Sequence, residues 1–179
     1  VIDSSGNLSS DSQMISIIDT TVPIITPSND ITLEAISIDE NIADLIPPSV
    51  YDIHDTSITN NSPEFFPIGE TTVTWTATDV AGNESSIEQK VTIVDTTSPS
   101  LQIPDQKTVE ATSLQNTIVE IGEAYADDIS GISSITNNAP EVFSLGTTLV
   151  TWNAVDNYGN TAIYDQTISV VDTTTPSIF

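Results

Sequence analysis

The sequence predicts an all-β protein made of repeated sandwich domains, and three observations support this prediction. Two short motifs recur at a fixed spacing along the chain. Several short segments alternate apolar and polar residues, as half-buried strands do. No stretch shows the period of about 3.6 residues that is typical of an amphipathic helix.

The repeat is defined by the motifs DTTxP and DxxGN. DTTxP occurs at 19–23, 95–99 and 172–176, and DxxGN occurs at 3–7, 79–83 and 156–160. Both motifs are spaced by 76 and then 77 residues, and each DxxGN aspartate lies 16 residues before the next DTTxP aspartate. This regularity predicts the C-terminal hairpin of one repeat at 1–18, complete repeats at 19–94 and 95–171, and the start of a following repeat at 172–179.

DTTxP has the composition of a linker between repeats. Its two threonines are β-branched and favour extended backbone. Its proline has no backbone N–H group and holds the preceding residue in an extended conformation. The linker is therefore expected to be short and stiff.

The clearest strand of each repeat precedes DxxGN. VTWTA at 73–77 and VTWNA at 150–154 alternate with period two, which places the valine, tryptophan and alanine of each segment inward. The final strand follows DxxGN and has a glutamine at the same place in each copy, at 13, 89 and 166. DxxGN itself is expected to form the hairpin turn, because glycine accepts positive φ and aspartate caps turns.

Repeats of this length with several short strands favour a seven-stranded sandwich of immunoglobulin type. The predicted fold is therefore all-β, with tandem immunoglobulin-like β-sandwich domains in a rod-like array.

The charge balance limits the partners. The chain has 26 acidic residues against 2 basic ones, which gives a formal net charge of −24. Such a field repels nucleic acid and anionic lipid headgroups. There is no cysteine, and no apolar run approaches the ~18 residues of a membrane span. We expect no nucleic-acid partner, no membrane insertion in this segment, and an origin within a longer exported, extracellular or cell-surface chain.

In order, the motifs resemble the hyalin repeat (HYR). DTTxP is followed by TLEA at 32–35 or TVEA at 108–111, and then by F-x-x-G-x-T-x-V-x-W-x-A-x-D-x-x-G-N. The chain also resembles the immunoglobulin-like surface repeats of bacteria and archaea, and the absence of the cysteine pair of many animal hyalin repeats favours a microbial source. The resemblance implies extracellular modules strung in tandem on adhesins, surface layers and appendages, and not catalysts.

Carboxylates are expected to gather where each repeat begins. The last strand of the first complete repeat spans about 33 Å if extended, so Asp79 and Asp95 lie at opposite ends of it and Asp79 lies near Asp19. The loops at 51–55 and 125–131 reach the same end of their repeats. The predicted metal ligands are Asp19, Asp52, Asp55, Asp79 and Asn83 in the first complete repeat, and Asp95, Asp127, Asp128, Asp156 and Asn160 in the second. Asp39 and Glu40 are further candidates for the second junction.

Calcium is the expected ion. Ca²⁺ takes six to eight oxygen ligands, and almost no lysine or arginine is present to neutralise the carboxylates. Related immunoglobulin-like adhesin repeats with DTTxP linkers are implied to bind it at their junctions. The alternative is that the DxxGN aspartates are only turn residues and that the linker aspartates are solvated. His54, the single histidine, is interpreted as a polar loop residue.

The sequence therefore predicts an extracellular structural or adhesive repeat segment of a cell-surface protein, a stalk rigidified by calcium at its domain junctions. Its partners are neighbouring immunoglobulin-like repeats in the same or adjacent chains. One alternative is a self-assembling subunit of a surface layer or extracellular filament, that is, a homo-polymer. Another is a module that binds glycans or proteins. An enzyme is not expected, because no catalytic triad or phosphate-binding loop occurs and the acidic residues recur in every repeat.

Overall fold

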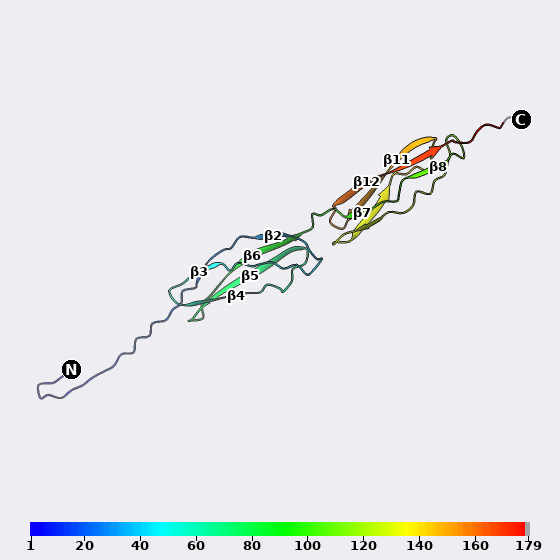
Figure 1. Ribbon diagram of the computed structural model, residues 1–179. Coiled ribbons are helices and arrows are strands. Elements are labelled where there is room, and N and C mark those ends of the chain that lie inside the picture. Colours follow the sequence, from blue (N-terminus) through cyan, green and yellow to red (C-terminus); the bar gives the residue numbers. More distant parts are fainter. Residues whose placement is uncertain (178–179) are drawn as a thin grey trace. The chain divides into compact units, whose positions relative to one another are not determined.

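The computed structural model describes residues 1–177 of the 179-residue chain, and it is all-β (Figure 1). The described residues form no helix, and so none that could cross a membrane. The strands are β1 (Ile24–Thr26), β2 (Ile31–Glu34), β3 (Ser49–Tyr51), β4 (Thr56–Asn60), β5 (Gly69–Asp79), β6 (Glu84–Val94), β7 (Ser100–Gln102), β8 (Lys107–Glu110), β9 (Tyr125–Asp127), β10 (Ile132–Asn137), β11 (Gly146–Asp156) and β12 (Thr161–Val171). The predicted all-β class is confirmed. Of the predicted start of a following repeat, residues 178 and 179 lie outside the described part.

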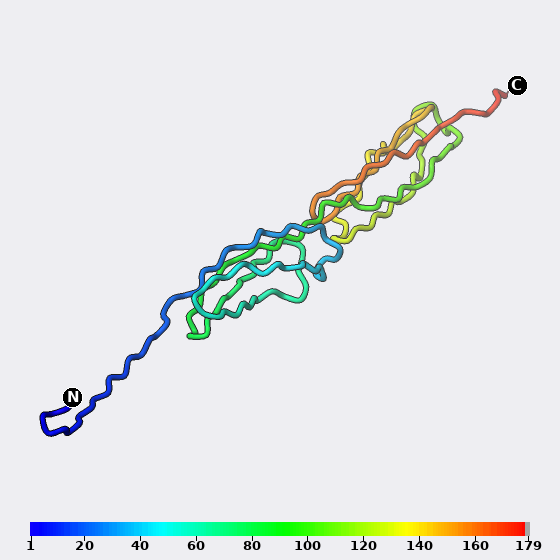
Figure 2. Tube along the Cα trace, turned by 60° about the vertical axis from the view of Figure 1, so that its left-hand side comes forward, coloured from blue at the N-terminus to red at the C-terminus, as the bar shows by residue number. Residues whose placement is uncertain are grey.

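Both complete repeats have the same sheet topology. The first has a four-stranded sheet in the order β2-β6-β5-β4 and a two-stranded sheet of β1 and β3. The second repeats this arrangement with β8-β12-β11-β10 and with β7 and β9. Each four-stranded sheet is mixed, because β2 joins β6 in parallel and β8 joins β12 in parallel. Figure 2 shows β2 in blue beside β6 in green.

The seven strands expected per repeat are not all present. Among the described residues each complete repeat has six strands and one single-residue bridge, between Asn41 and Phe66 in the first and at Thr117 in the second. The Asn41 side chain accepts hydrogen bonds from the backbone N–H groups of Ile36 and Ser37 and donates one to the Phe66 carbonyl. A loop fastened by a side chain therefore replaces the missing strand.

The cores follow the predicted alternation. The inward residues of β5, β6, β11 and β12 are almost fully buried: Val73, Trp75, Ala77, Val91, Ile93, Val150, Trp152, Ala154, Ile168 and Val170. In the second repeat these strands pack with Leu101, Ala126 and Phe143 into one cluster. The period-two pattern in the sequence thus identified the core.

The recurring glutamine is a core residue. Gln166 is fully buried, and its Oε1 accepts a hydrogen bond of 3.1 Å from the Trp152 indole. Its Nε2 donates to the carbonyls of Asp105 and Ile121 at 2.8 and 2.9 Å. Gln89 makes the equivalent bond with Trp75 at 3.0 Å. A buried indole N–H needs an acceptor, which explains why a polar residue recurs inside an apolar strand.

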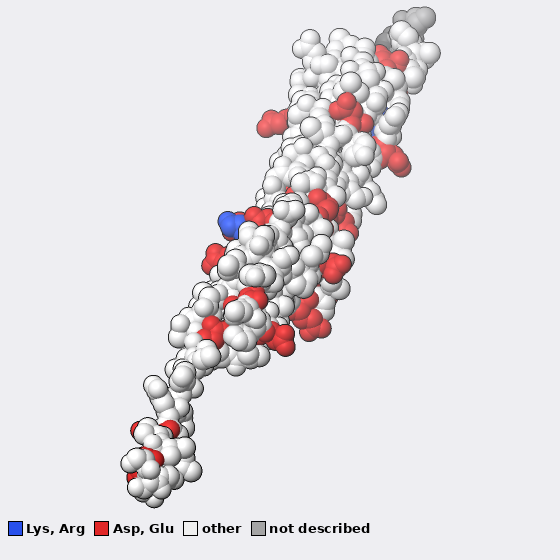
Figure 3. Space-filling model, turned by 90° about the vertical axis from the view of Figure 1, so that its left-hand side faces the viewer, with Lys and Arg blue, Asp and Glu red and all other residues white. Residues whose placement is uncertain are grey.

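Acidic side chains are spread along the chain on the face shown in Figure 3, where basic side chains are few. The contacts within the chain divide it into two compact units. The second unit contains Ile31–Asp44, Pro63–Thr71 and the described residues from Lys90 onward. Strand β2, the DTTxP linker at 95–99 and the second repeat therefore belong to one unit.

Candidate cation sites at the repeat entrances

The DxxGN motif forms the predicted hairpin turn, and each of its defined letters has a structural role. Asp156 Oδ1 accepts hydrogen bonds from the backbone N–H groups of Tyr158 and Asn160, both at 2.8 Å. Asp156 Oδ2 accepts a bond of 2.8 Å from the Asn160 side chain. Gly159 has a φ of 91°, in the left-handed region that favours glycine. The sequence therefore predicted this turn from its chemistry.

The asparagine of the motif also holds the linker. Asn160 Nδ2 donates to the backbone carbonyl of Asp95 at 3.1 Å, across 65 residues of sequence. Asn83 does the same to the Asp19 carbonyl at 3.3 Å. The turn and the preceding linker are thus connected by one amide group at the entrance of each complete repeat.

The turn aspartates are ionised at neutral pH. Burial raises the pKa of Asp156, but the hydrogen bonds from Asn160 and from the turn outweigh it and lower the pKa below 3.8. The pKa of Asp79 is lowered in the same way, with burial opposed by the bonds from Asn83. Both turns therefore carry a negative charge at neutral pH.

At the entrance of the second repeat three carboxylates converge. One oxygen from each of Asp95, Asp128 and Asp156 lies within 4.8 Å of the others. Asp95 is only 7 % exposed, and its Oδ1 accepts bonds from the N–H and hydroxyl of Thr97. Its Oδ2 is buried and has no hydrogen-bond partner. A buried carboxylate oxygen without a donor is costly, and a cation with oxygen ligands would satisfy it.

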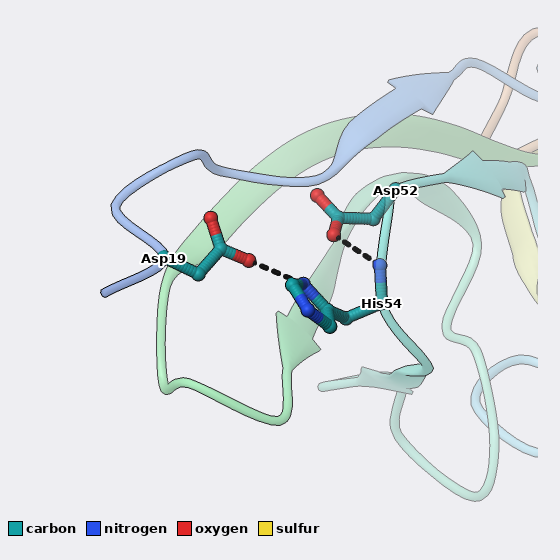
Figure 4. Close-up of side chains that lie close together, drawn as sticks. All are labelled: Asp19, Asp52 and His54. Carbon is teal, nitrogen blue, oxygen red and sulfur yellow. Dashed lines mark hydrogen bonds and ion pairs between the residues drawn. The ribbon is translucent and has the colours of Figure 1, made fainter. Parts of the chain in front are cut away.

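The entrance of the first repeat holds a different group, Asp19, Asp52 and His54 (Figure 4). His54 Nδ1 lies 2.7 Å from Asp19 Oδ2, and the His54 backbone N–H donates to Asp52 at 2.9 Å. A backbone bond from Thr21, followed by the bond from His54, lowers the pKa of Asp19 against the effect of burial. One of the possible metal-ligand atoms in this group is thus a nitrogen, whereas the group at the entrance of the second repeat offers only carboxylate oxygens.

The loop registers of the two repeats can now be matched. Asp52 and Asp128 each accept a bond from the backbone N–H of the residue two positions on, His54 in one case and Ser130 in the other. Asp52 and Asp128 are therefore equivalent, and His54 occupies the place of Ser130. The sequence did not reveal this match, because the loops at 51–55 and 125–131 differ in length and their register was left open.

The structure brings some of the predicted ligands together and leaves others apart. The predicted residues within the two groups are Asp19, Asp52, Asp95, Asp128 and Asp156. Asn83 and Asn160 lie in the turns and hold the linkers, and Asp79 is buried in its turn. The metal-binding role of all of them remains a prediction.

Asp55 and Asp127 lie outside these groups. Asp127 is an exposed residue of β9. Adjacent residues of a strand face opposite sides, so Asp127 points away from the group that Asp128 faces. Asp55 is exposed and leads directly into β4. Asp39 and Glu40 are also outside the groups. His54, interpreted from the sequence as a loop residue, lies inside one; its spacing of two residues from Asp52 was the available signal.

The comparisons with known proteins agree with the motifs. The HYR domain model matches residues 18–93 and 94–171. Hyalin of Strongylocentrotus purpuratus is 37 % identical over 204 residues, covering 99 % of this chain and 16 % of that protein. Hyalin of Lytechinus variegatus is 32 % identical over 177 residues, covering 90 % and 33 %. The chain thus spans a third or less of the length of these relatives.

Solved structures that resemble part of the fold include two with TM-scores below 0.5. Drosophila N-cadherin EC1-4 covers 85 % of this chain and 50 % of its own, with 12 % identity and a TM-score of 0.40. Human protocadherin-24 EC1-2 covers 86 % of this chain and all of its own, with 12 % identity and a TM-score of 0.37.

Proposed function

The chain belongs to the HYR domain family, and from that premise we propose that it is an extracellular adhesive repeat segment of a cell-surface protein, with calcium holding its repeat junctions. The role is structural rather than catalytic. The ionised turn aspartates recur at the same place in each repeat instead of lining one pocket. A microbial source remains a prediction from the sequence.

The observation that supports calcium most strongly is the group at Asp95, Asp128 and Asp156. It offers anionic oxygens only, and Asp95 has a buried oxygen without any donor. Asp95 belongs to the linker, whereas Asp128 and Asp156 belong to the following repeat. An ion held by all three would therefore fasten the linker to the repeat that follows it. Calcium supplies the positive charge that the chain itself lacks at this place.

The expected gain in stability is modest but measurable. Extracellular calcium modules typically have a Kd of about 10⁻⁴–10⁻³ M. With a Kd of about 0.5 mM and about 10 mM free calcium, binding to the folded state alone adds about 1.8 kcal/mol per site. For a domain of this size that corresponds to a rise in Tm of roughly 7–14 °C.

The test is a thermal melt of the chain together with a small-angle scattering profile, in calcium and then in excess chelator. Calcium is expected to raise the Tm and to narrow the distribution of conformations that the scattering profile reports. Magnesium at equal concentration is the ion control, because its small octahedral shell fits protein carboxylate cages poorly. Identical melts and profiles in calcium and chelator would contradict the proposal.

A second candidate function, self-assembly into a surface layer or extracellular filament, remains a prediction from the sequence. Light scattering over a concentration series tests it: a mass that grows with concentration would support it, and a constant monomer mass would contradict it. Binding of glycans or other proteins remains a prediction.

A further inference from the structure

Glu34 of the TLEA segment and Glu110 of the TVEA segment each accept hydrogen bonds from the linker that follows their own repeat. Thr96 donates from its backbone N–H to Glu34 Oε1 at 2.7 Å and from its hydroxyl to Glu34 Oε2 at 2.9 Å. Thr173 makes the same two bonds to Glu110, both at 2.8 Å. Two bonds to one carboxylate fix both the position and the orientation of the linker backbone.

The sheet topology explains why this glutamate reaches the linker. Strand β2 runs parallel to β6, and their register pairs Glu34 with Val94, the residue before Asp95. The next residue, Ala35, donates its N–H to the Val94 carbonyl at 2.7 Å. The first strand of the four-stranded sheet therefore ends beside the place where the last strand enters the linker.

A single peptide bond is held from two sides at the second junction. The Asp95 carbonyl accepts from Asn160 of the following repeat, and the Thr96 N–H of the same peptide unit donates to Glu34 of the preceding repeat. The peptide unit between 19 and 20 has the asparagine bond but no glutamate bond, and the peptide unit between 172 and 173 has the glutamate bond but no asparagine bond. Within residues 1–177, the peptide bond between 95 and 96 alone has both.

We infer that Glu34 is a positioning residue for the Asp95 group, so that the preceding repeat sets the calcium affinity of the following one. This inference rests on the proposed calcium function. Three carboxylates in one place repel one another, and Asp95 would relieve the repulsion by turning away if its backbone were free. The two-sided hold keeps Asp95 against Asp128 and Asp156 before the ion arrives, so less ordering remains to be done on binding.

Glu34 is also a negative charge near the linker, and a purely electrostatic effect has to be separated from positioning. Glu34→Asp keeps the charge but is one methylene too short to hold Thr96 as Glu34 does. Glu34→Gln removes the charge but keeps the length, with an oxygen that accepts from the Thr96 N–H. Positioning predicts that the aspartate variant is impaired and the glutamine variant is not. A charge effect predicts the opposite order.

The experiment is a calcium titration of the full chain, monitored by NMR. The Ser130 amide reports on the Asp128 loop, and the Thr96 amide reports on the hydrogen bonds to Glu34. We expect Glu34→Asp to weaken the calcium binding reported by Ser130 about threefold to tenfold, the equivalent of losing one hydrogen bond of ordinary strength. Glu34→Gln should stay within about twofold of the parent chain. The matched control is Glu110→Asp, which breaks the same contact at Thr173 and should leave the Ser130 titration unchanged.

The outcomes separate this inference from the proposed function. If Glu34→Asp shifts the Thr96 amide yet binds calcium as tightly as the parent, the inference is overturned and the calcium function stands. The reverse order of the two variants, with glutamine weak and aspartate intact, also overturns it and assigns Glu34 a charge effect. If the parent chain shows no calcium-dependent shift at Ser130, the proposed function fails and the inference fails with it.

Discussion

Replacing Asp95 by asparagine is expected to change the stability of the chain in opposite directions with and without calcium. Asparagine retains an oxygen that can accept the two bonds from Thr97, which Asp95 Oδ1 now accepts. It replaces the buried, partnerless Oδ2 by an amide that can donate to a neighbouring carboxylate. The substitution therefore removes a charge from the group while the linker keeps its local bonds.

The magnitude follows from the geometry. Two unit charges no more than 4.8 Å apart repel by at least about 3.5 kcal/mol at an effective dielectric constant of about 20. Asp95 takes part in two of the three pairs. Counterions and small movements of the loop reduce the net effect, and we expect a gain of about 1 kcal/mol in the absence of calcium. In about 10 mM calcium the parent gains about 1.8 kcal/mol by ion binding and the variant does not. The variant is then less stable than the parent by about 0.8 kcal/mol.

The assay is denaturant unfolding of both chains in chelator and in calcium, followed by tryptophan fluorescence, because each complete repeat has one buried tryptophan. The control is Asp127→Asn, which removes the same charge from an exposed residue outside the group. Its effect should be within about 0.5 kcal/mol and independent of calcium. If Asp95→Asn is destabilising to the same extent in chelator and in calcium, the carboxylates are not in repulsive contact and the reasoning is refuted.

Three further predictions concern the core and the turns. Gln166→Met keeps the volume but leaves the Trp152 indole and two carbonyls unpaired, so unfolding experiments should show a loss of about 2–4 kcal/mol; Gln13→Met, at an exposed position of equal register, should show almost none. Gly82→Ala forces a side chain onto a φ of 89° and should lower the Tm by the equivalent of about 1–2 kcal/mol, a loss that would be absent if the turn relaxes. Because the folded pKa of Asp156 is lowered, its stabilisation is present above the unfolded value of 3.8 and is lost as the pH falls through the folded pKa; the Tm should drop below about pH 4, and less steeply in Asp156→Asn.

The sequence was sufficient for the fold wherever an element has a local chemical signature. Period-two alternation located β5 and β11 and their buried faces, and DxxGN located the hairpin turns. It was not sufficient for the number of strands, because the loop around Asn41 is held by side-chain bonds that follow no periodic pattern. Local sequence patterns predict the hydrogen-bond ladders between strands, but they do not predict a side-chain amide that takes the place of such a ladder.

The candidate sites were predictable to the level of the loop and not to the level of the residue. Chain direction alone placed Asp95, Asp128 and Asp156 at one entrance. Choosing between Asp127 and Asp128 required the pairing of Ser100 with Asp127, which fixes the face on which each side chain lies. The sequence also did not place His54 in a group, because its contact with Asp19 joins residues that are 35 positions apart in the chain.

The contact of Glu34 with Thr96 shows why the junction was harder to predict than the domain. The sequence did place acidic residues of the preceding repeat near the second linker, but it chose Asp39 and Glu40 on proximity to the end of that repeat. The observed residue is Glu34, which depends on β2 being parallel to β6. In an antiparallel pair the same glutamate would lie at the other end of the sheet, far from the linker. The three motifs that recur in the sequence, DTTxP, DxxGN and the glutamate of TLEA, all meet at the peptide bond between 95 and 96. These three motifs therefore recur at the place where one repeat is joined to the next, which is the expected pattern if the junction has a structural role of its own.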